Sequence, residues 1–364
     1  MKRKHAITSA VVVLVLAVLV YFQVRHWQAF DWKEFVRQTA GVSKTQIAIA
    51  IVLIYGVYVL RAVRWAILLK PVRSIPVTRL IIPQFIGFTA LALLGRPGEL
   101  VRPILIAKKE DLSVASQLAV WTVERVFDIA AVALLLGLTL AVRGGKYEAY
   151  PEVARAGIAL LVVTGVLVVV VVLLWWRAQA FANMLERLLN LYSKRIANAV
   201  CHRITAFGQG LKTIHGVGSF VAIMMLSFAI WLMIAQSYIQ VLHAYPQAET
   251  QVQNSQTRVM ETRTVRLHEM KLEDVLLVMG ASMAGSIIQL PGVGGGSQLA
   301  VISLLSSNIF RGEPYNISRE LAVSAGMMLW LVTFMSVIPA GLFLAHRQHI
   351  SLREVSEEPV PSEP

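Results

Sequence analysis

Charged side chains lie within stretches of the chain that are otherwise apolar. Arg61 and Arg64 are three residues apart in one stretch, and Glu124, Arg125 and Asp128 follow in another. Residues three or four apart share a face of a helix, so we expect Glu124 and Asp128 to point to the same side. Because guanidinium groups bind carboxylate and phosphate oxygens in a fork, these residues indicate either a site for an anionic group or ion pairs between helices.

A further group of charges lies at a break that is rich in glycine and proline. The break carries Arg96, Glu99 and Arg102, and its two arginines suit a phosphate or another anionic group. Glu99 could balance one arginine, bind a cationic group or carry a proton. Alternatively, an Arg–Glu pair only holds the break in shape. We predict that the chain turns at Gly95, Pro97 and Gly98.

A second break, between residues 291 and 298, consists almost entirely of glycine and small polar residues. Such a run leaves backbone N–H and C=O groups unpaired and could bind an anion. It lacks the Lys-Ser/Thr ending of a nucleotide-binding loop, so we expect no nucleotide there. The residues of this predicted break are Pro291, Gly292, Gly294, Gly295, Gly296, Ser297 and Gln298.

The composition indicates what kind of protein carries these charges. Of the 364 residues, 56% are hydrophobic and only 15% are charged, against roughly 25% charged in an average soluble domain. This excludes an ordinary soluble enzyme and a disordered chain, and predicts an all-α integral membrane protein. In a membrane, Arg61 and Arg64, followed by Trp65, also fit long side chains that reach the polar interface.

The charge and the rare residues exclude other functions. The net charge of +13 comes from basic residues in short loops between apolar segments. Membrane proteins carry such residues in their cytoplasmic loops, so we expect no nucleic-acid partner. The eight histidines have no metal-ligand spacing and Cys201 is the one cysteine, so we predict no metal site, no disulfide and no cofactor.

We predict six full spanning helices and two shorter interrupted segments. The apolar segments at 80–94 and 275–290 are too short to span, since the first would reach about 22 Å against a hydrocarbon core of about 30 Å. Each is followed by a break and another short apolar piece, which favours two re-entrant hairpins; partial crossings that give eight spans are the alternative. The full spans are expected at about 7–24, 46–69, 114–142, 158–176, 217–242 and 321–345.

The loops and repeats suggest how the chain is organised. The basic loops place both termini in the cytoplasm. The order span, broken hairpin, span occurs twice with opposite orientation, which favours an inverted-topology repeat. The predicted parts are an N-terminal helix and outer loop at 1–45, a membrane domain at 46–345 with halves at 46–142 and 217–345, an amphipathic cytoplasmic segment at 177–215, a polar outer insert with a weak strand-pair pattern at 243–274, and a disordered tail at 346–364.

Four motifs together resemble the lysylphosphatidylglycerol synthase transmembrane-region family, also called the flippase-like domain family. The resemblance covers about residues 45–345 and rests on the order of the motifs and their placement against the apolar segments. The motifs are Arg61-x-x-Arg64-Trp65, Gly95-Arg96-x-Gly98-Glu99-x-x-Arg102, Glu124-Arg125-x-x-Asp128, and Pro291-Gly292 with the glycines that follow.

The resemblance implies a multi-pass protein of the bacterial cytoplasmic membrane that moves or handles lipids or lipid-linked sugars. In the full-length synthases a soluble aminoacyl-transfer domain follows the membrane region. About 19 residues follow the last predicted span here, so we expect neither lysyl transfer nor an enzyme. The family usually has a glutamate where this chain has Gln298. If that carboxylate carries a proton or contacts a cationic headgroup in the family, this chain lacks that function at this position.

The leading hypothesis is a lipid flippase whose partners are membrane lipids with an anionic headgroup or a lipid-linked sugar. Arg96 and Arg102, helped by Arg61 and Arg64, would hold the headgroup. The acids Glu99, Glu124 and Asp128 would tune the charge, with Arg125 beside them. The alternatives are a membrane enzyme or enzyme subunit acting on a lipid-linked substrate, and a non-catalytic scaffold that binds envelope-synthesis enzymes.

Overall fold

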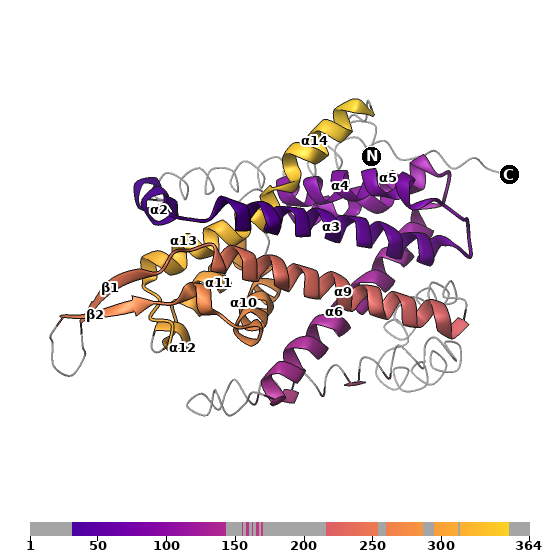
Figure 1. Cartoon of the computed structure of the whole chain (residues 1–364). Helices are drawn as coiled ribbons and strands as arrows, with labels where there is room; N and C mark the ends of the chain where they lie inside the picture. The colour runs from indigo at the N-terminus through magenta and orange to yellow at the C-terminus, as the bar shows by residue number, and fades with distance from the viewer. Residues whose placement is uncertain are drawn as a thin grey trace, which may run out of the picture.

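The computed structural model describes residues 31–142, 216–253, 260–286, 295–311 and 314–348, and scattered positions between 155 and 169 (Figure 1). The protein is mostly helical. Several predictions lie outside the described residues. They are the first span, most of the fourth span, the amphipathic segment 177–215, nearly all of the tail, and Pro291, Gly292 and Gly294 of the second break.

The first half of the membrane domain contains two long helices with a folded-back pair between them. Ser43 caps the first helix through its side chain, and α6 begins at Val114, where its apolar stretch was predicted to begin. The helices are α3 (Lys44–Leu69), α4 (Val77–Leu94), the short 3₁₀ helix η1 (Arg96–Leu100), α5 (Val101–Lys109) and α6 (Val114–Val142).

The second half has the same order of elements. A long helix is followed by two shorter helices that pack together and by a long helix with a π-helical segment. The elements are α9 (Gly216–His243), α10 (Leu272–Gly285), α11 (Gly295–Leu305), the single turn α12 (Asn308–Arg311), α13 (Arg319–Trp330), the π-helical segment η4 (Leu331–Met335) and α14 (Val337–Arg347).

Among the described residues, four helical stretches are long and apolar enough to cross a membrane. They are Lys44–Leu69, Val77–Leu94, Gly216–His243 and Arg319–Arg347. The second of them was predicted as a half-length helix from residue 80. It begins at Val77, directly after Pro76, and its 18 residues reach about 27 Å. The re-entrant hairpin therefore stays a prediction, whereas the fold-back of α5 onto α4 is observed.

Helix α2 (Trp32–Thr39) and the polar insert lie beside the long helices, and α2 packs against α13. Helix α2 occupies the predicted outer loop, capped by Asp31, whose carboxylate accepts a hydrogen bond from the Glu34 amide at 3.0 Å. The polar insert contains β1 (Ala248–Gln253) and β2 (Met260–Val265), which pair antiparallel with Ala248 opposite Val265. A short 3₁₀ turn, η3 (Leu267–Glu269), follows them. The strand pair extends away from the helices in Figure 1.

The two halves contact each other in a reciprocal way. Helices α3 and α9, the first of each half, pack side by side along the centre of the bundle (Figure 1). Helix α4 packs against α14 of the other half, and the corresponding helix α10 packs against α6. Within each half the contacts also correspond, since α4 packs on α3 and α5, and α10 packs on α9 and α11.

The turn after α4 depends on two glycines of the first predicted break. Gly95 ends α4 with φ of 69°, a conformation that side chains disfavour. Gly98 lies against α4 so closely that a Cβ atom there would stand 2.2 Å from the Ala90 carbonyl oxygen. Because that obstacle is backbone, it cannot rotate away. Gly98 therefore sets how closely η1 and α5 fold onto α4.

We predict that Gly98→Ala destabilises the protein by about 1–3 kcal/mol, the usual cost of forcing extra volume into a packed site. The measurement is the thermal unfolding midpoint of purified protein in detergent. Gly218→Ala is the matched control, because a Cβ atom there meets nothing within 4 Å. An unchanged midpoint for Gly98→Ala would contradict the close packing of this turn.

Candidate functional site

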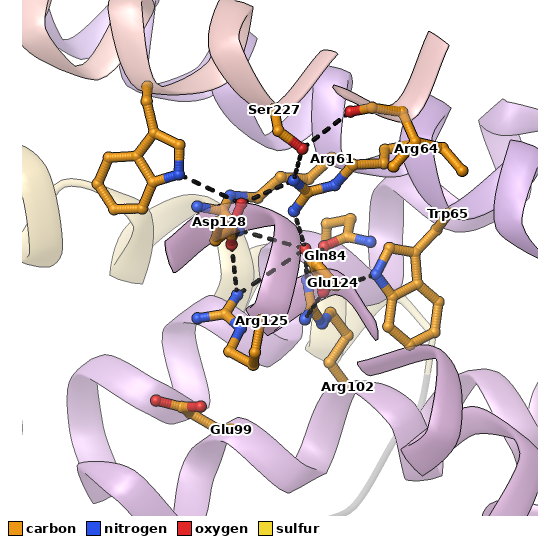
Figure 2. A network of polar contacts seen from close by, with 12 residues as sticks. Arg61, Arg64, Trp65, Gln84, Glu99, Arg102, Glu124, Arg125, Asp128 and Ser227 are labelled. Carbon is orange, nitrogen blue, oxygen red and sulfur yellow. Dashed lines mark hydrogen bonds and ion pairs between the residues drawn. The ribbon is translucent and has the colours of Figure 1, made fainter. Parts of the chain in front are cut away.

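Six of the eight predicted headgroup residues meet in one polar network between α3, α5 and α6. Figure 2 shows the carboxylates of Glu124 and Asp128 surrounded by arginine side chains. The predicted residues in this network are Arg61, Arg64, Arg102, Glu124, Arg125 and Asp128.

Glu124 is the centre of the network. Its carboxylate receives hydrogen bonds from Arg64 at 2.6 Å and from Arg61 at 3.2 Å, both from α3. Arg102 of α5 binds both oxygens of the same carboxylate. The Trp65 indole N–H donates to it at 2.8 Å. One side chain of α6 thus fixes the orientation of α3 and of the folded-back helix α5.

Asp128 lies one turn further along α6 and contacts a fourth helix, α9. It accepts hydrogen bonds from Arg64 at 2.7 Å and from Arg61 at 3.1 Å. The Trp231 indole of α9 donates to it at 3.3 Å. Ser227, also on α9, accepts a hydrogen bond from Arg64 at 2.8 Å. The expectation that Glu124 and Asp128 share a helix face agrees with these contacts.

Most of the network is buried, and aromatic rings lie against two of its arginines. The arginines of α3 and α5 are at most 4% exposed, and Glu124 is fully buried. The Arg61 guanidinium lies 5.1 Å from the centre of the Phe88 ring, and Arg102 lies 4.8 Å from that of Trp65. Such cation–π contacts stabilise a desolvated cation by up to about 2 kcal/mol.

Positive charge exceeds negative charge in this network. Four arginines surround two carboxylates, so the group carries a surplus of two positive charges. Arg125 is the arginine that faces outward, with 31% of its side chain exposed while it contacts Asp128 at 3.1 Å. Because unbalanced buried charge is costly, the exposed guanidinium is where an anion would be stabilised most readily.

The other two predicted residues, Arg96 and Glu99, form a separate pair. Arg96 donates to the Glu99 carboxylate at 2.5 Å and to the Ser286 carbonyl oxygen at 2.5 Å. Ser286 follows α10, so this contact joins the first predicted break to the end of α10. The side chain of Arg96 is 40% exposed. Figure 2 shows Glu99 apart from the dashed contacts of the main network.

A cavity of about 560 Å³ connects these charged groups. Its charged lining residues are Arg61, Arg96, Glu99, Arg125 and Asp128, and the rest of its wall is mainly apolar. Helices α3, α4, α6, α9 and α10 and the π-helical segment all contribute side chains to it. A cavity of this size accommodates a small ligand or a lipid headgroup, since ligand pockets measure roughly 300–1,000 Å³.

The described residues of the second break begin helix α11 rather than line the cavity. Gly295 and Gly296 form its first turn, and a Cβ atom on Gly285 of α10 would stand 2.1 Å from the Gly296 carbonyl oxygen. Ser297 and Gln298 are buried, and the Gln298 amide contacts the Met327 sulfur at 3.3 Å. These four residues do not line the cavity, and anion binding by this break stays a prediction.

Sequence reasoning missed several polar partners of the site. Gln84 accepts a hydrogen bond from Arg102 at 2.8 Å, and Ser227, Trp231 and Ser286 make the contacts described above. Each is a lone polar or amphipathic residue within or at the end of an apolar helix. A polar group within a membrane needs a hydrogen-bond partner, so the sequence could have indicated that each of these residues has one. It could not have shown which residue the partner is. Among the described residues, no three His, Cys, Asp or Glu side chains gather as metal ligands would.

The sequence was also compared with models of known protein families. Residues 7–250 match the family described as lysylphosphatidylglycerol synthase TM region. The chain belongs to this family. The match includes Arg61, Arg102 and Glu124 and ends within β1, so it starts earlier and stops sooner than the resemblance at 45–345, and the second break lies beyond it. A comparison with curated proteins finds no match. Membership of this family makes the chain a multi-pass membrane protein connected with lipid handling.

We predict that Glu124→Gln lowers stability by about 3–5 kcal/mol, because it leaves three buried arginines with one carboxylate fewer. Glu99→Gln is the matched control, since its partner Arg96 is partly exposed and such a pair is worth about 1 kcal/mol or less. Thermal unfolding of both variants in the same detergent measures the difference. Equal losses for the two variants would show that Glu124 is not the centre of the network.

Proposed function

We propose that the protein translocates a lipid with an anionic headgroup across the bacterial cytoplasmic membrane. The headgroup would enter the cavity and bind Arg125 and Arg96, while the acyl chains stay against the apolar helices. The observation that carries this proposal is the surplus of two positive charges beside a largely apolar cavity.

The buried arginines have a different role in this proposal from the two exposed ones. Arg64 and Arg102 donate their hydrogens to carboxylates and neighbouring side chains within the protein. Arg125 and Arg96 are 31% and 40% exposed and line the cavity. The buried arginines therefore supply long-range positive charge, and the carboxylates of Glu124 and Asp128 hold Arg125 in place. The exposed arginines contact a phosphate through charge-assisted hydrogen bonds.

The arrangement of the helices supports transport. The reciprocal contacts, α4 with α14 and α10 with α6, are those that an inverted repeat with a two-fold axis would produce. Transporters of this architecture bind substrate between their repeats and move one repeat against the other. We therefore include in the proposal that the two hairpins re-enter the membrane, that six helices span it, and that both termini face the cytoplasm.

The proposal assigns no chemical step to this chain. The lipid leaves the cavity unchanged, and its passage is downhill or coupled to an ion gradient. The partners are membrane lipids, and enzymes of envelope synthesis would supply or consume the translocated lipid. An enzyme on a lipid-linked substrate and a scaffold without its own activity remain the alternatives that the following experiment separates.

We predict that Arg125→Gln and Arg96→Gln each slow lipid transfer roughly tenfold or more, because each removes a charge-assisted hydrogen bond to the headgroup. Full-length protein would be placed in liposomes containing phosphatidylglycerol with a fluorescent acyl chain. A membrane-impermeant quencher then reports the lipid that reaches the outer leaflet. Wild-type protein is expected to expose more than the outer-leaflet half of the label.

Arg79→Gln is the matched control, because Arg79 lies on α4 but is 62% exposed and does not line the cavity. It should transfer lipid as the wild type does. Normal transfer by both cavity variants would overturn the assigned roles. A lipid product of changed mass would favour the enzyme, and full complementation of a deletion by charge-neutralised variants would favour the scaffold.

A further inference from the structure

A cluster of hydroxyl groups lines the same cavity and is not used by the charged network. The Tyr238 hydroxyl of α9 donates to the Ser282 hydroxyl of α10 at 3.0 Å. Thr333 of the π-helical segment lines the same cavity. Tyr238 is 4% exposed and Ser282 is 7% exposed. Three helical segments therefore bring three hydroxyls to one cavity, apart from the charged residues that also line it.

These hydroxyls retain hydrogen-bonding capacity for a ligand. A hydroxyl donates one hydrogen bond and accepts two. Tyr238 uses its proton on Ser282, and Thr333 uses its proton on the Leu329 carbonyl oxygen at 2.7 Å. Ser282 accepts the hydrogen bond from Tyr238, and its own hydroxyl proton can be donated to a ligand oxygen. Lone pairs on the three oxygens remain for ligand O–H groups.

The cluster continues from the Arg96 contact along one face of α10. Ser282 and Ser286 are four residues apart and share that face, at a separation of about 6 Å. Arg96 binds the Ser286 carbonyl oxygen at 2.5 Å. A ligand phosphate on Arg96 would therefore lie about one helical turn from the hydroxyls, which is the length of a phosphate joined to a small polyol.

The π-helical segment places Thr333 in this cluster. Its defining hydrogen bond runs from the Ser336 amide to the Leu331 carbonyl at 2.9 Å. The extra residue in this turn changes which side chains face the cavity, and Thr333 and Phe334 both line it. Single π turns of this kind are frequent at functional sites.

We infer that Tyr238, Ser282 and Thr333 form a second subsite, which binds hydroxyl groups of a polyol linked to the phosphate of the lipid. The inference rests on the proposed function for the phosphate position and adds the chemical class of the headgroup. The two sources of this chemistry are a glycerol and a cyclic polyol or sugar. A lipid with the same charge and no hydroxyl lacks partners for this subsite.

The test compares lipid binding by the full-length protein in detergent. The probes are short-chain phosphatidylglycerol, phosphatidylinositol and phosphatidylethanol, which share a singly charged phosphodiester and differ in hydroxyl content. Binding is measured from the rise in unfolding temperature with lipid concentration, because a ligand of the folded state stabilises it. We expect at least one hydroxyl-bearing lipid to bind roughly 2- to 10-fold more tightly than phosphatidylethanol. Tighter binding of phosphatidylglycerol would identify a glycerol headgroup, and tighter binding of phosphatidylinositol a cyclic polyol.

Tyr238→Phe and Ser282→Ala should each remove this preference and leave phosphatidylethanol binding unchanged. Tyr245→Phe is the matched control, because Tyr245 is a buried tyrosine that pairs with Ser324 at 3.1 Å and does not line the cavity. No preference in the wild type, or a preference that both variants retain, would overturn the subsite. Binding preference without lipid transfer in liposomes would overturn the proposed function and leave the subsite standing.

Discussion

Two buried carboxylates on α6 determine much of the arrangement around them. A charged carboxylate in a low-dielectric interior is stable only if cations and hydrogen-bond donors reach it. Glu124 obtains them from α3 and α5, and Asp128 obtains them from α3 and α9. Apolar packing between membrane helices has no such directional preference, because lipid chains and leucine side chains are equally apolar. The ion network therefore gives the relative positions of these helices a specificity that packing alone lacks.

The folded-back helix α5 shows how backbone and charge act together. Gly95 and Gly98 allow the chain to reverse and approach α4 closely, and Arg102 then lies where Gln84 and Glu124 can bind it. The reversal also leaves Arg96 at the tip, where it contacts Ser286 of the other half. Local backbone geometry at the break thus decides which arginine is buried in the network and which one faces the cavity.

The sequence predicted the elements of the site better than their partners. Charges at 61, 64, 124 and 128 within apolar stretches indicated either an anion site or ion pairs between helices, because membrane-embedded charges need partners. Arg61 and Arg64 also fitted side chains that reach the polar interface. The limits of the apolar stretches correctly predicted that α4 ends at Leu94 and that α6 begins at Val114. Which arginine binds which acid depends on tertiary packing, and no local pattern contains it. Arg96 pairs with Glu99 and Arg102 does not, although both arginines are three residues from that acid.

Other differences have local causes that could have been recognised. Helix α2 was expected to be a loop, yet Asp31 with Glu34 three residues later is the pattern of a helix cap, and Glu34 then pairs with Arg37 at 2.8 Å. In water, this ion pair lowers the pKa of Glu34 through hydrogen bonding to the Arg37 guanidinium. By contrast, no local pattern pairs Tyr238 with Ser282, and only the folded chain brings them together.

The surplus of positive charge in the network has an electrical consequence. Moving one elementary charge across a potential of 100 mV changes the free energy by about 2.3 kcal/mol. The four arginines and two acids are carried on α3, α5 and α6, and their contacts hold them together as one unit. A rearrangement that carries this unit along the membrane normal moves net charge through the transmembrane field. The membrane voltage then biases the equilibrium between the conformations on either side of that movement, even when no ion crosses.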